Sequence, residues 1–75
     1  MPRRQFSGAR LGFLVRETGL SVYALEQDLR KTGSSLDRAT IARHVSGEVT
    51  PTVTTLADYA DYFMVPMDFF FEWKL

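Results

Sequence analysis

Few side chains in this 75-residue sequence have the type and spacing that catalysis needs. Asp58 and Asp61 stand three residues apart on a predicted helix, which is one arrangement for a hydrolytic carboxylate pair. No set of nucleophile, base and orienting group accompanies them, so we interpret both as part of a solvated helix face. The chain has no cysteine and a single histidine, His44, which excludes thiol chemistry and imidazole clusters. We therefore expect no enzymatic activity, no metal site and no cofactor.

Charge is distributed unevenly along the chain, although nine basic and nine acidic residues cancel. Residues 1–45 contain eight basic and four acidic residues, a net charge of +4, whereas residues 46–75 contain one and five, a net charge of −4. A fold that places the first part on one side would have a basic face and an acidic back. Such a dipole can orient a protein on a polyanion. The alternative is scattered surface charge with no net field.

Hydrophobic periodicity and capping residues predict five short helices that must position these charges. They are expected over residues 9–18, 22–31, 38–45, 53–63 and 67–71. Ser21 and Asp37 suit the N-caps of the second and third helices, while Gly19 and Gly47 suit left-handed helix ends. The expected inward-facing residues are Leu11, Leu14, Val15, Val22, Leu25, Leu29, Ile41, Val45, Val53, Leu56, Ala57, Ala60 and Phe63. Such short helices and connections favour a compact, orthogonally packed all-α domain.

Four segments resemble parts of the helix-turn-helix domain of phage-repressor and Cro type proteins, the XRE family, and they occur along the chain in the same order as in that family. Residues 38–47, RATIARHVSG, are similar to the recognition helix and its closing glycine. Residues 48–56, EVTPTVTTL, and 57–70, ADYADYFMVPMDFF, resemble the loop and helices that follow it, and residues 19–21, GLS, resemble the first interhelical break. The resemblance covers residues 10–71. It implies a five-helix repressor-like domain that binds double-stranded DNA.

The same resemblance assigns DNA-contacting roles to individual residues. Arg38, Ala39 and Arg43 match the positions that usually contact bases. Arginine can donate two hydrogen bonds to guanine, and the alanine methyl can contact the methyl of thymine. The candidates for contacts to the DNA backbone are Ser21, Lys31, Asp37, Thr40, Ser46 and Thr50. For His44 we expect a partly buried packing role, with phosphate contact or pH sensing as the alternative.

Two features depart from the family pattern. The turn at residues 31–36 is about five residues longer than the pattern, so the placement of the recognition helix is open. Val22 also stands where many relatives have a glutamine that contacts phosphate.

Residues 1–8 are expected to form a flexible basic arm before a domain spanning residues 9–75. Arg3 and Arg4 in this arm either reach a DNA groove or lie in a disordered terminus.

The chain ends in an unusually aromatic segment. Phe69, Phe70, Phe71 and Trp73 cannot all face one core if residues 67–71 are helical, because successive residues of a helix diverge by about 100°. We expect these aromatics to form the interface of a homodimer. The alternative is that Trp73 and Leu75 fold back onto the core.

Together these observations predict a dimeric, sequence-specific DNA-binding regulator of transcription, expected to act as a repressor. The competing hypothesis is a protein-interaction module on the same fold, such as an antitoxin or accessory subunit that binds a partner through its C-terminal aromatics.

No segment matches a signal peptide or a membrane span. We therefore expect a cytoplasmic, nucleoid-associated protein of prokaryotic or phage origin.

Overall fold

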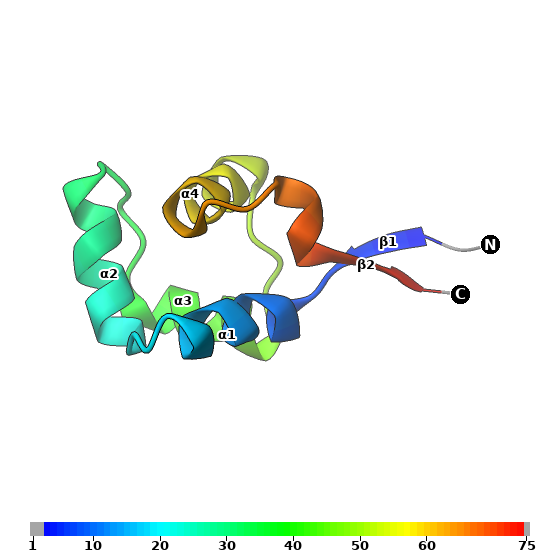
Figure 1. Cartoon of the computed structure of the whole chain (residues 1–75), viewed down its shortest axis with the longest axis horizontal. Coiled ribbons are helices and arrows are strands. Elements are labelled where there is room, and N and C mark those ends of the chain that lie inside the picture. Colours follow the sequence, from blue (N-terminus) through cyan, green and yellow to red (C-terminus); the bar gives the residue numbers. More distant parts are fainter. Residues whose placement is uncertain (1–2, 75) are drawn as a thin grey trace.

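The computed structural model describes residues 3–74, which form four α-helices, one 3-10 turn and a small two-stranded antiparallel sheet (Figure 1). In chain order these are β1 (Arg3–Phe6), α1 (Gly8–Glu17), α2 (Val22–Lys31), α3 (Arg38–Ser46), α4 (Val53–Phe63), the 3-10 turn η1 (Met67–Phe70) and β2 (Phe71–Lys74). The compact, mostly helical character is confirmed. The prediction of an all-α domain with five helices is wrong.

The fifth helix is absent from the described residues because the two ends of the described chain pair with each other. Residues 3–6 were expected to be part of a flexible arm, yet they form β1 and pair with β2 from Arg3 opposite Lys74 to Phe6 opposite Phe71. The Ser7 amide extends this pairing by donating to the carbonyl of Phe70, at 2.7 Å. Phe71 is therefore extended, and the helical segment before it stops after one 3-10 turn.

Side-chain caps fix where each helix begins. Ser7, Ser21, Asp37 and Thr52 each accept a hydrogen bond from the backbone amide three residues later. This satisfies one of the amides that every helix start leaves without an intrahelical partner. The predicted caps Ser21 and Asp37 are thus confirmed.

The predicted glycine stops are also present. After α1, the amide of Leu20 donates to the Val15 carbonyl at 3.2 Å, with Gly19 at a φ of 72°. This is the hydrogen bond of a Schellman motif, in which a left-handed residue closes the helix. Gly47, at a φ of 81°, ends α3 in the same backbone conformation.

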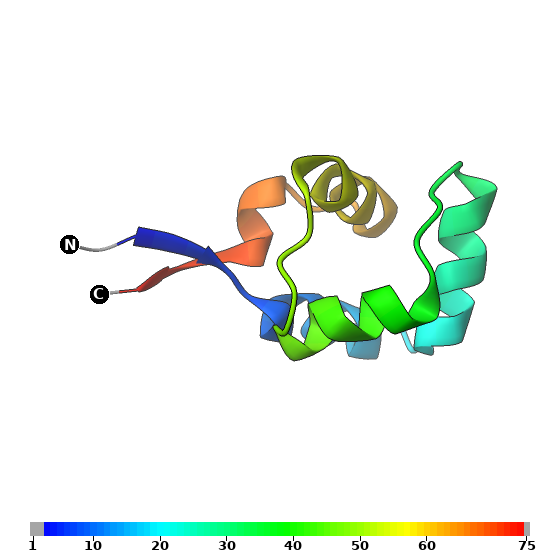
Figure 2. The same cartoon turned by 180° about the vertical axis from the view of Figure 1, so that it is seen from behind.

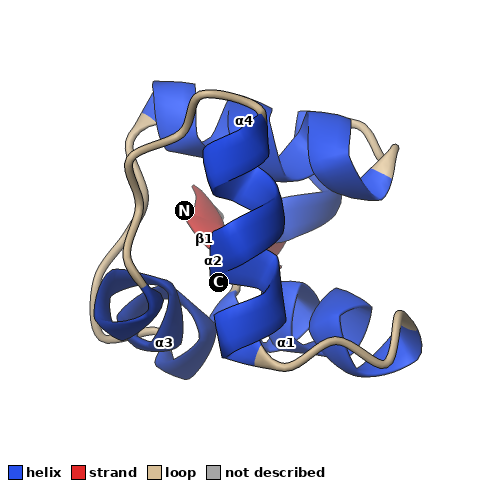
Figure 3. Cartoon of the chain, turned by 90° about the vertical axis from the view of Figure 1, so that its left-hand side faces the viewer, coloured by secondary structure: helices blue, strands red, loops and turns tan. Residues whose placement is uncertain are grey.

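The helices enclose one core between two layers. Helices α1 and α3 lie side by side in one layer, α4 lies across from them, and α2 closes one end (Figures 1 to 3). The paired strands project from the other end. The buried apolar residues are Leu11, Val15, Leu25, Leu29, Ile41, Leu56, Tyr59, Ala60 and Phe70. Val53 was expected inside but is 73% exposed, because it occupies the first turn of α4.

No helix within residues 3–74 is long and apolar enough to cross a membrane.

Candidate nucleic-acid interface

Helix α3 has one buried face and one solvent face, and its arginines lie on the second. Ile41 is fully buried and His44 is 3% exposed, so these two residues hold the helix against the core. The exposed positions follow helical spacing and form a continuous strip made of Arg38, Ala39, Ala42, Arg43 and Ser46. The three predicted base-contacting residues, Arg38, Ala39 and Arg43, are therefore brought together on one accessible face.

The side chain of Asp37 marks the start of this strip. Its carboxylate accepts the Thr40 amide at 2.8 Å, and the hydrogen bonds from Thr40, followed by the charges of Arg43 and Arg30, lower the pKa of this carboxyl. Asp37 is thus an ionised cap for α3. Its negative side chain would repel a phosphate, so the prediction that Asp37 contacts the DNA backbone can hold only for its main chain.

Helix α2 positions the first residue of α3 through two side chains. The guanidinium of Arg38 lies over the ring of Tyr23, with 5.1 Å between the guanidinium carbon and the ring centroid. The carboxylate of Glu26 accepts the backbone amide of Arg38 at 2.7 Å and lies 3.6 Å from Arg30. Glu26 is only 5% exposed, so this hydrogen bond is largely shielded from water.

Sequence reasoning missed both Tyr23 and Glu26. Glu26 shares the helical face of Val22, Leu25 and Leu29, so a carboxylate on an apolar stripe was the available indication of a buried partner. Tyr23 lies off that stripe and is 53% exposed. Nothing local in the sequence indicated its contact with Arg38.

The long turn between α2 and α3 explains why these contacts exist. Residues 32–37 run back along α2 before α3 begins, so the start of α3 lies beside the first half of α2 (Figure 2). Both contacts of Arg38, to Tyr23 and to Glu26, are to that half. The amino-terminal ends of α2 and α3 consequently face the same region of the surface.

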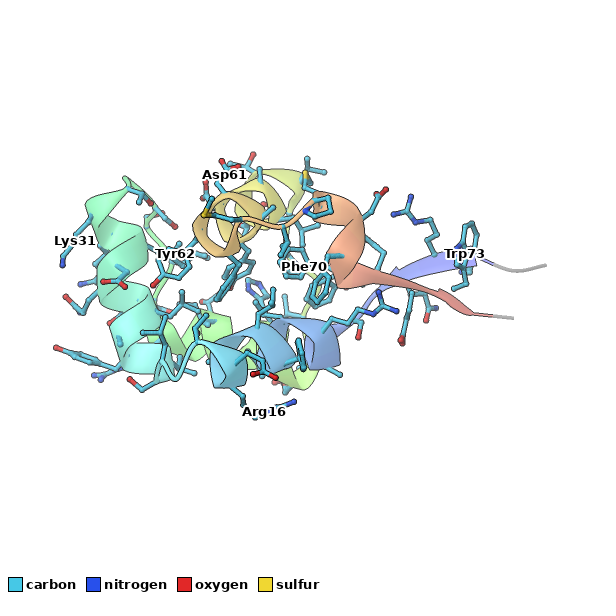
Figure 4. The ribbon with its side chains drawn as sticks, viewed as in Figure 1. Arg16, Lys31, Asp61, Tyr62, Phe70 and Trp73 are labelled. Atoms are coloured by element: carbon cyan, nitrogen blue, oxygen red, sulfur yellow. The ribbon has the colours of Figure 1, made fainter. Side chains whose placement is uncertain are left out.

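The candidate backbone contacts divide into those near the strip and those away from it. Ser21, at the start of α2, is exposed, and Thr40 is half-buried within α3. Ser46 and Thr50 are exposed at and beyond the other end of α3. Lys31 is exposed but lies at the far end of α2, where it pairs with Asp28 at 3.9 Å (Figure 4). The structure therefore separates Lys31 from the other candidates.

The terminal candidates occupy the paired strands. Arg4 forms an ion pair with Asp68 at 2.6 Å, and its guanidinium lies 5.3 Å from the centroid of the Phe71 ring. Arg3 is exposed near the tip. Both arginines thus lie on a defined strand at the end of the molecule opposite α2 (Figure 1).

The aromatic residues of the predicted dimer interface are not equivalent. Phe70 is fully buried in the core of its own chain, so its assignment to an intermolecular interface is wrong. Phe69 and Phe71 are half-buried, whereas Trp73 is 68% exposed and points away from the helical body (Figure 4). The alternative in which Trp73 folds back onto the core is also wrong. Leu75 lies outside the described residues.

His44 links α3 to α4. Its Nδ1 atom lies 2.8 Å from the hydroxyl of Tyr59, and the two rings meet edge to face. Burial lowers the pKa of His44 and raises the pKa of the Tyr59 hydroxyl, because both charged forms lose solvation. His44 is a packing residue, as predicted, although it is almost fully buried rather than partly buried.

Acidic side chains of α4 lie on the side of the molecule away from α1. Asp61 projects from α4, while Arg16 projects from the opposite side of the molecule (Figure 4). Asp58 and Asp61 line a pocket with Thr32 and Tyr62. No group of three or more metal-ligating side chains occurs within residues 3–74.

Tyr62 joins this acidic side to α2. Its hydroxyl donates to the carboxylate of Asp28 at 2.5 Å, and this hydrogen bond contributes most to raising the pKa of Tyr62 to about 12. The contact ties α4 to α2 and keeps the Tyr62 hydroxyl protonated. It is a structural contact between helices.

We compared the chain with protein families, with curated proteins and with solved structures, and none of the three comparisons found a match.

Proposed function

We propose that this protein is a sequence-specific double-stranded DNA-binding regulator of transcription that inserts α3 into the major groove as a homodimer. The observation that carries the proposal is the exposed strip of α3, with Arg38 and Arg43 on a helix whose other face is anchored by buried Ile41 and His44. Regulation would follow from occupying a promoter, and we expect repression.

The dimensions of the two molecules support this arrangement. A helix with its side chains is about 10–12 Å across, and the major groove of B-DNA is about 12 Å wide. Arg38 and Arg43 could then bond guanine edges, while the methyl of Ala39 contacts thymine. The amino-terminal ends of α2 and α3 face the same region of the protein surface. In this arrangement they would lie toward the phosphates of the DNA, because helix amino termini attract anions.

Variants that remove positive charges on α3 and away from it test the proposal, and the single variants Arg43→Ala and Lys31→Ala are the pair matched in charge. Binding of a mixed-sequence duplex at about 50 mM salt should weaken roughly tenfold in Arg38→Ala/Arg43→Ala, and the salt dependence should become shallower. Lys31→Ala removes one positive charge at the far end of α2 and should bind nearly as well as the original protein. Equal losses in Lys31→Ala and Arg43→Ala would contradict the assignment to α3.

The protein-interaction hypothesis makes the opposite prediction for the same variants. A module that acts only through its C-terminal aromatics would lose nothing when Arg38 and Arg43 are replaced. Its function would depend on Trp73, which lies outside α3 and is largely exposed.

A further inference from the structure

Arg16, in the last turn of α1, is an exposed cation that the proposed contacts of α2 and α3 do not include. Its side chain forms no ion pair or hydrogen bond with another residue in the described part of the chain. By contrast, three basic side chains elsewhere form ion pairs, namely Arg4 with Asp68, Arg30 with Glu26 and Lys31 with Asp28. Arg16 therefore presents its charge to solvent without an acidic partner among residues 3–74.

The guanidinium of Arg16 lies between α1 and α3. A β-carbon added at Gly12 would lie 3.3 Å from Nη1 of Arg16 and 3.2 Å from Cγ1 of Val45. Gly12 is buried one turn earlier on the same face of α1, so the Arg16 side chain folds back over it. Val45 belongs to α3 and precedes Ser46, which is part of the exposed strip. The charge is thereby held beside α3.

This charge lies on the side of the molecule where we expect DNA. Arg16 projects from the layer of α1 and α3, away from α4 (Figure 4). Helix α2 begins beside the same layer (Figure 1), with its cap, Ser21, a short connection after Arg16. The starts of α2 and α3 face one region of the surface, and Arg16 extends that region onto α1.

We propose that Arg16 binds a backbone phosphate of double-stranded DNA, so that the interface includes α1 as well as α2 and α3. This inference rests on the proposed insertion of α3 into the major groove. Packed helices lie about 8–10 Å apart and the groove is about 12 Å wide, so a neighbour of the inserted helix lies over the edge of the groove. The sugar-phosphate backbone runs along that edge, and a guanidinium can donate two parallel hydrogen bonds to a phosphate.

A phosphate contact has a signature that differs from a base contact. Phosphates carry no sequence information directly, so Arg16 should contribute equally to binding of any duplex, unlike Arg38 and Arg43. Each phosphate that a protein neutralises also adds about 0.9 to the slope of log affinity against log salt concentration. The salt dependence of binding therefore counts such contacts.

Arg16→Gln tests the contact, because it removes the charge and keeps most of the side-chain stem over Gly12. On a mixed-sequence duplex at about 50 mM salt its dissociation constant should rise about three- to tenfold, and the slope should become shallower by about 0.9. Lys31→Gln removes the same charge at the far end of α2 and should leave both quantities nearly unchanged. Fluorescence anisotropy over a series of salt concentrations measures all three proteins.

Arg16→Lys separates this contact from a purely structural role. A cation in the last turn of a helix also offsets the negative end of the helix dipole. Loss of that role alone would lower the melting temperature of Arg16→Gln and leave the salt slope of the folded protein unchanged. Arg16→Lys retains the charge and should recover the slope of the original protein.

The outcomes distinguish failure of this inference from failure of the proposed function. An original slope in Arg16→Gln, or an equal change in Lys31→Gln, overturns the phosphate contact, and loss of binding in Arg38→Ala/Arg43→Ala would still leave DNA recognition by α3 standing. A shallower slope in Arg16→Gln with full binding by Arg38→Ala/Arg43→Ala supports the contact and overturns the role of α3. A folded protein that binds no duplex overturns both.

Discussion

The guanidinium of Arg38 lies over the ring of Tyr23, 5.1 Å from its centroid, so a residue of α2 orients the first residue of α3. Both side chains are exposed, so the guanidinium of Arg38 remains accessible to a base. The Tyr23 ring restricts the orientations that this guanidinium can adopt. An arginine held in this way loses less conformational freedom when it bonds a base.

Replacing the ring should therefore weaken DNA binding without unfolding the protein. An exposed cation–π contact contributes about 0.5–1 kcal/mol, so Tyr23→Ala should bind DNA roughly two- to fivefold more weakly. Tyr23→Phe keeps the ring and should bind within about twofold of the original protein. Fluorescence anisotropy with a labelled duplex measures both variants. Equal loss in the two would assign the effect to the hydroxyl.

Removing the carboxylate of Glu26 should destabilise the start of α3. The backbone amide of Arg38 would lose its acceptor in a region that is largely shielded from water, at a cost of about 1–3 kcal/mol. Glu26→Gln retains an acceptor oxygen and should lose less stability than Glu26→Ala. Urea denaturation followed by circular dichroism measures the difference. Equal destabilisation by the two variants would show that the hydrogen bond between the Arg38 amide and Glu26 is not the source of the lost stability.

The contact between His44 and Tyr59 should make stability depend on pH in one direction. Burial lowers the pKa of His44 below its usual 6.5, so the unfolded chain takes up a proton before the folded protein does. The free energy of unfolding should therefore fall as pH decreases below about 6.5, by at most about 1.4 kcal/mol per pH unit for this group.

The matched variant for this prediction is His44→Gln, which cannot titrate. It should be less stable at neutral pH but should show a shallower decrease between pH 7.5 and pH 5.5. Urea denaturation at the two pH values gives the comparison. An unchanged slope in the variant would mean that other groups dominate the response.

Gly8 permits the close approach of α1 and α3. A β-carbon at this position would lie 2.5 Å from the carbonyl oxygen of His44 and 2.6 Å from that of Val45. Backbone atoms cannot move aside as a flexible side chain can. Gly8→Ala should therefore lower the free energy of unfolding by about 1–3 kcal/mol. At Gly12 the corresponding neighbours are side chains of Val45 and Arg16, at 3.2 and 3.3 Å. Gly12→Ala should therefore have a much smaller effect on the thermal midpoint.

Local features of the sequence were sufficient to predict most of the helical part. Ser21, Asp37 and Gly47 act through hydrogen bonds or backbone angles within a few residues, so their roles follow from residue type and spacing. The outward position of Arg38 and Arg43 followed from the inward position of Ile41 in the same helix.

The terminal strands depend on contacts that local patterns do not contain. Arg3–Phe6 has no apolar alternation of its own and is extended because residues 71–74 lie beside it. The alternation of Phe71, Glu72 and Trp73 was present in the sequence, but the aromatic run before it favoured a helix. The end of α4 at Met64, in a left-handed conformation, could not be predicted from the sequence either, because non-glycine residues rarely adopt a φ of 57°.

Selection of binding sites from a random duplex pool at about 150 mM salt tests the central claim most directly, because binding through phosphates alone weakens steeply at that ionic strength. We predict enrichment of a palindrome whose half-sites lie about one helical turn or a multiple apart, and loss of that enrichment in Arg38→Ala/Arg43→Ala. No enrichment by the folded protein would contradict the proposal that α3 recognises DNA sequence.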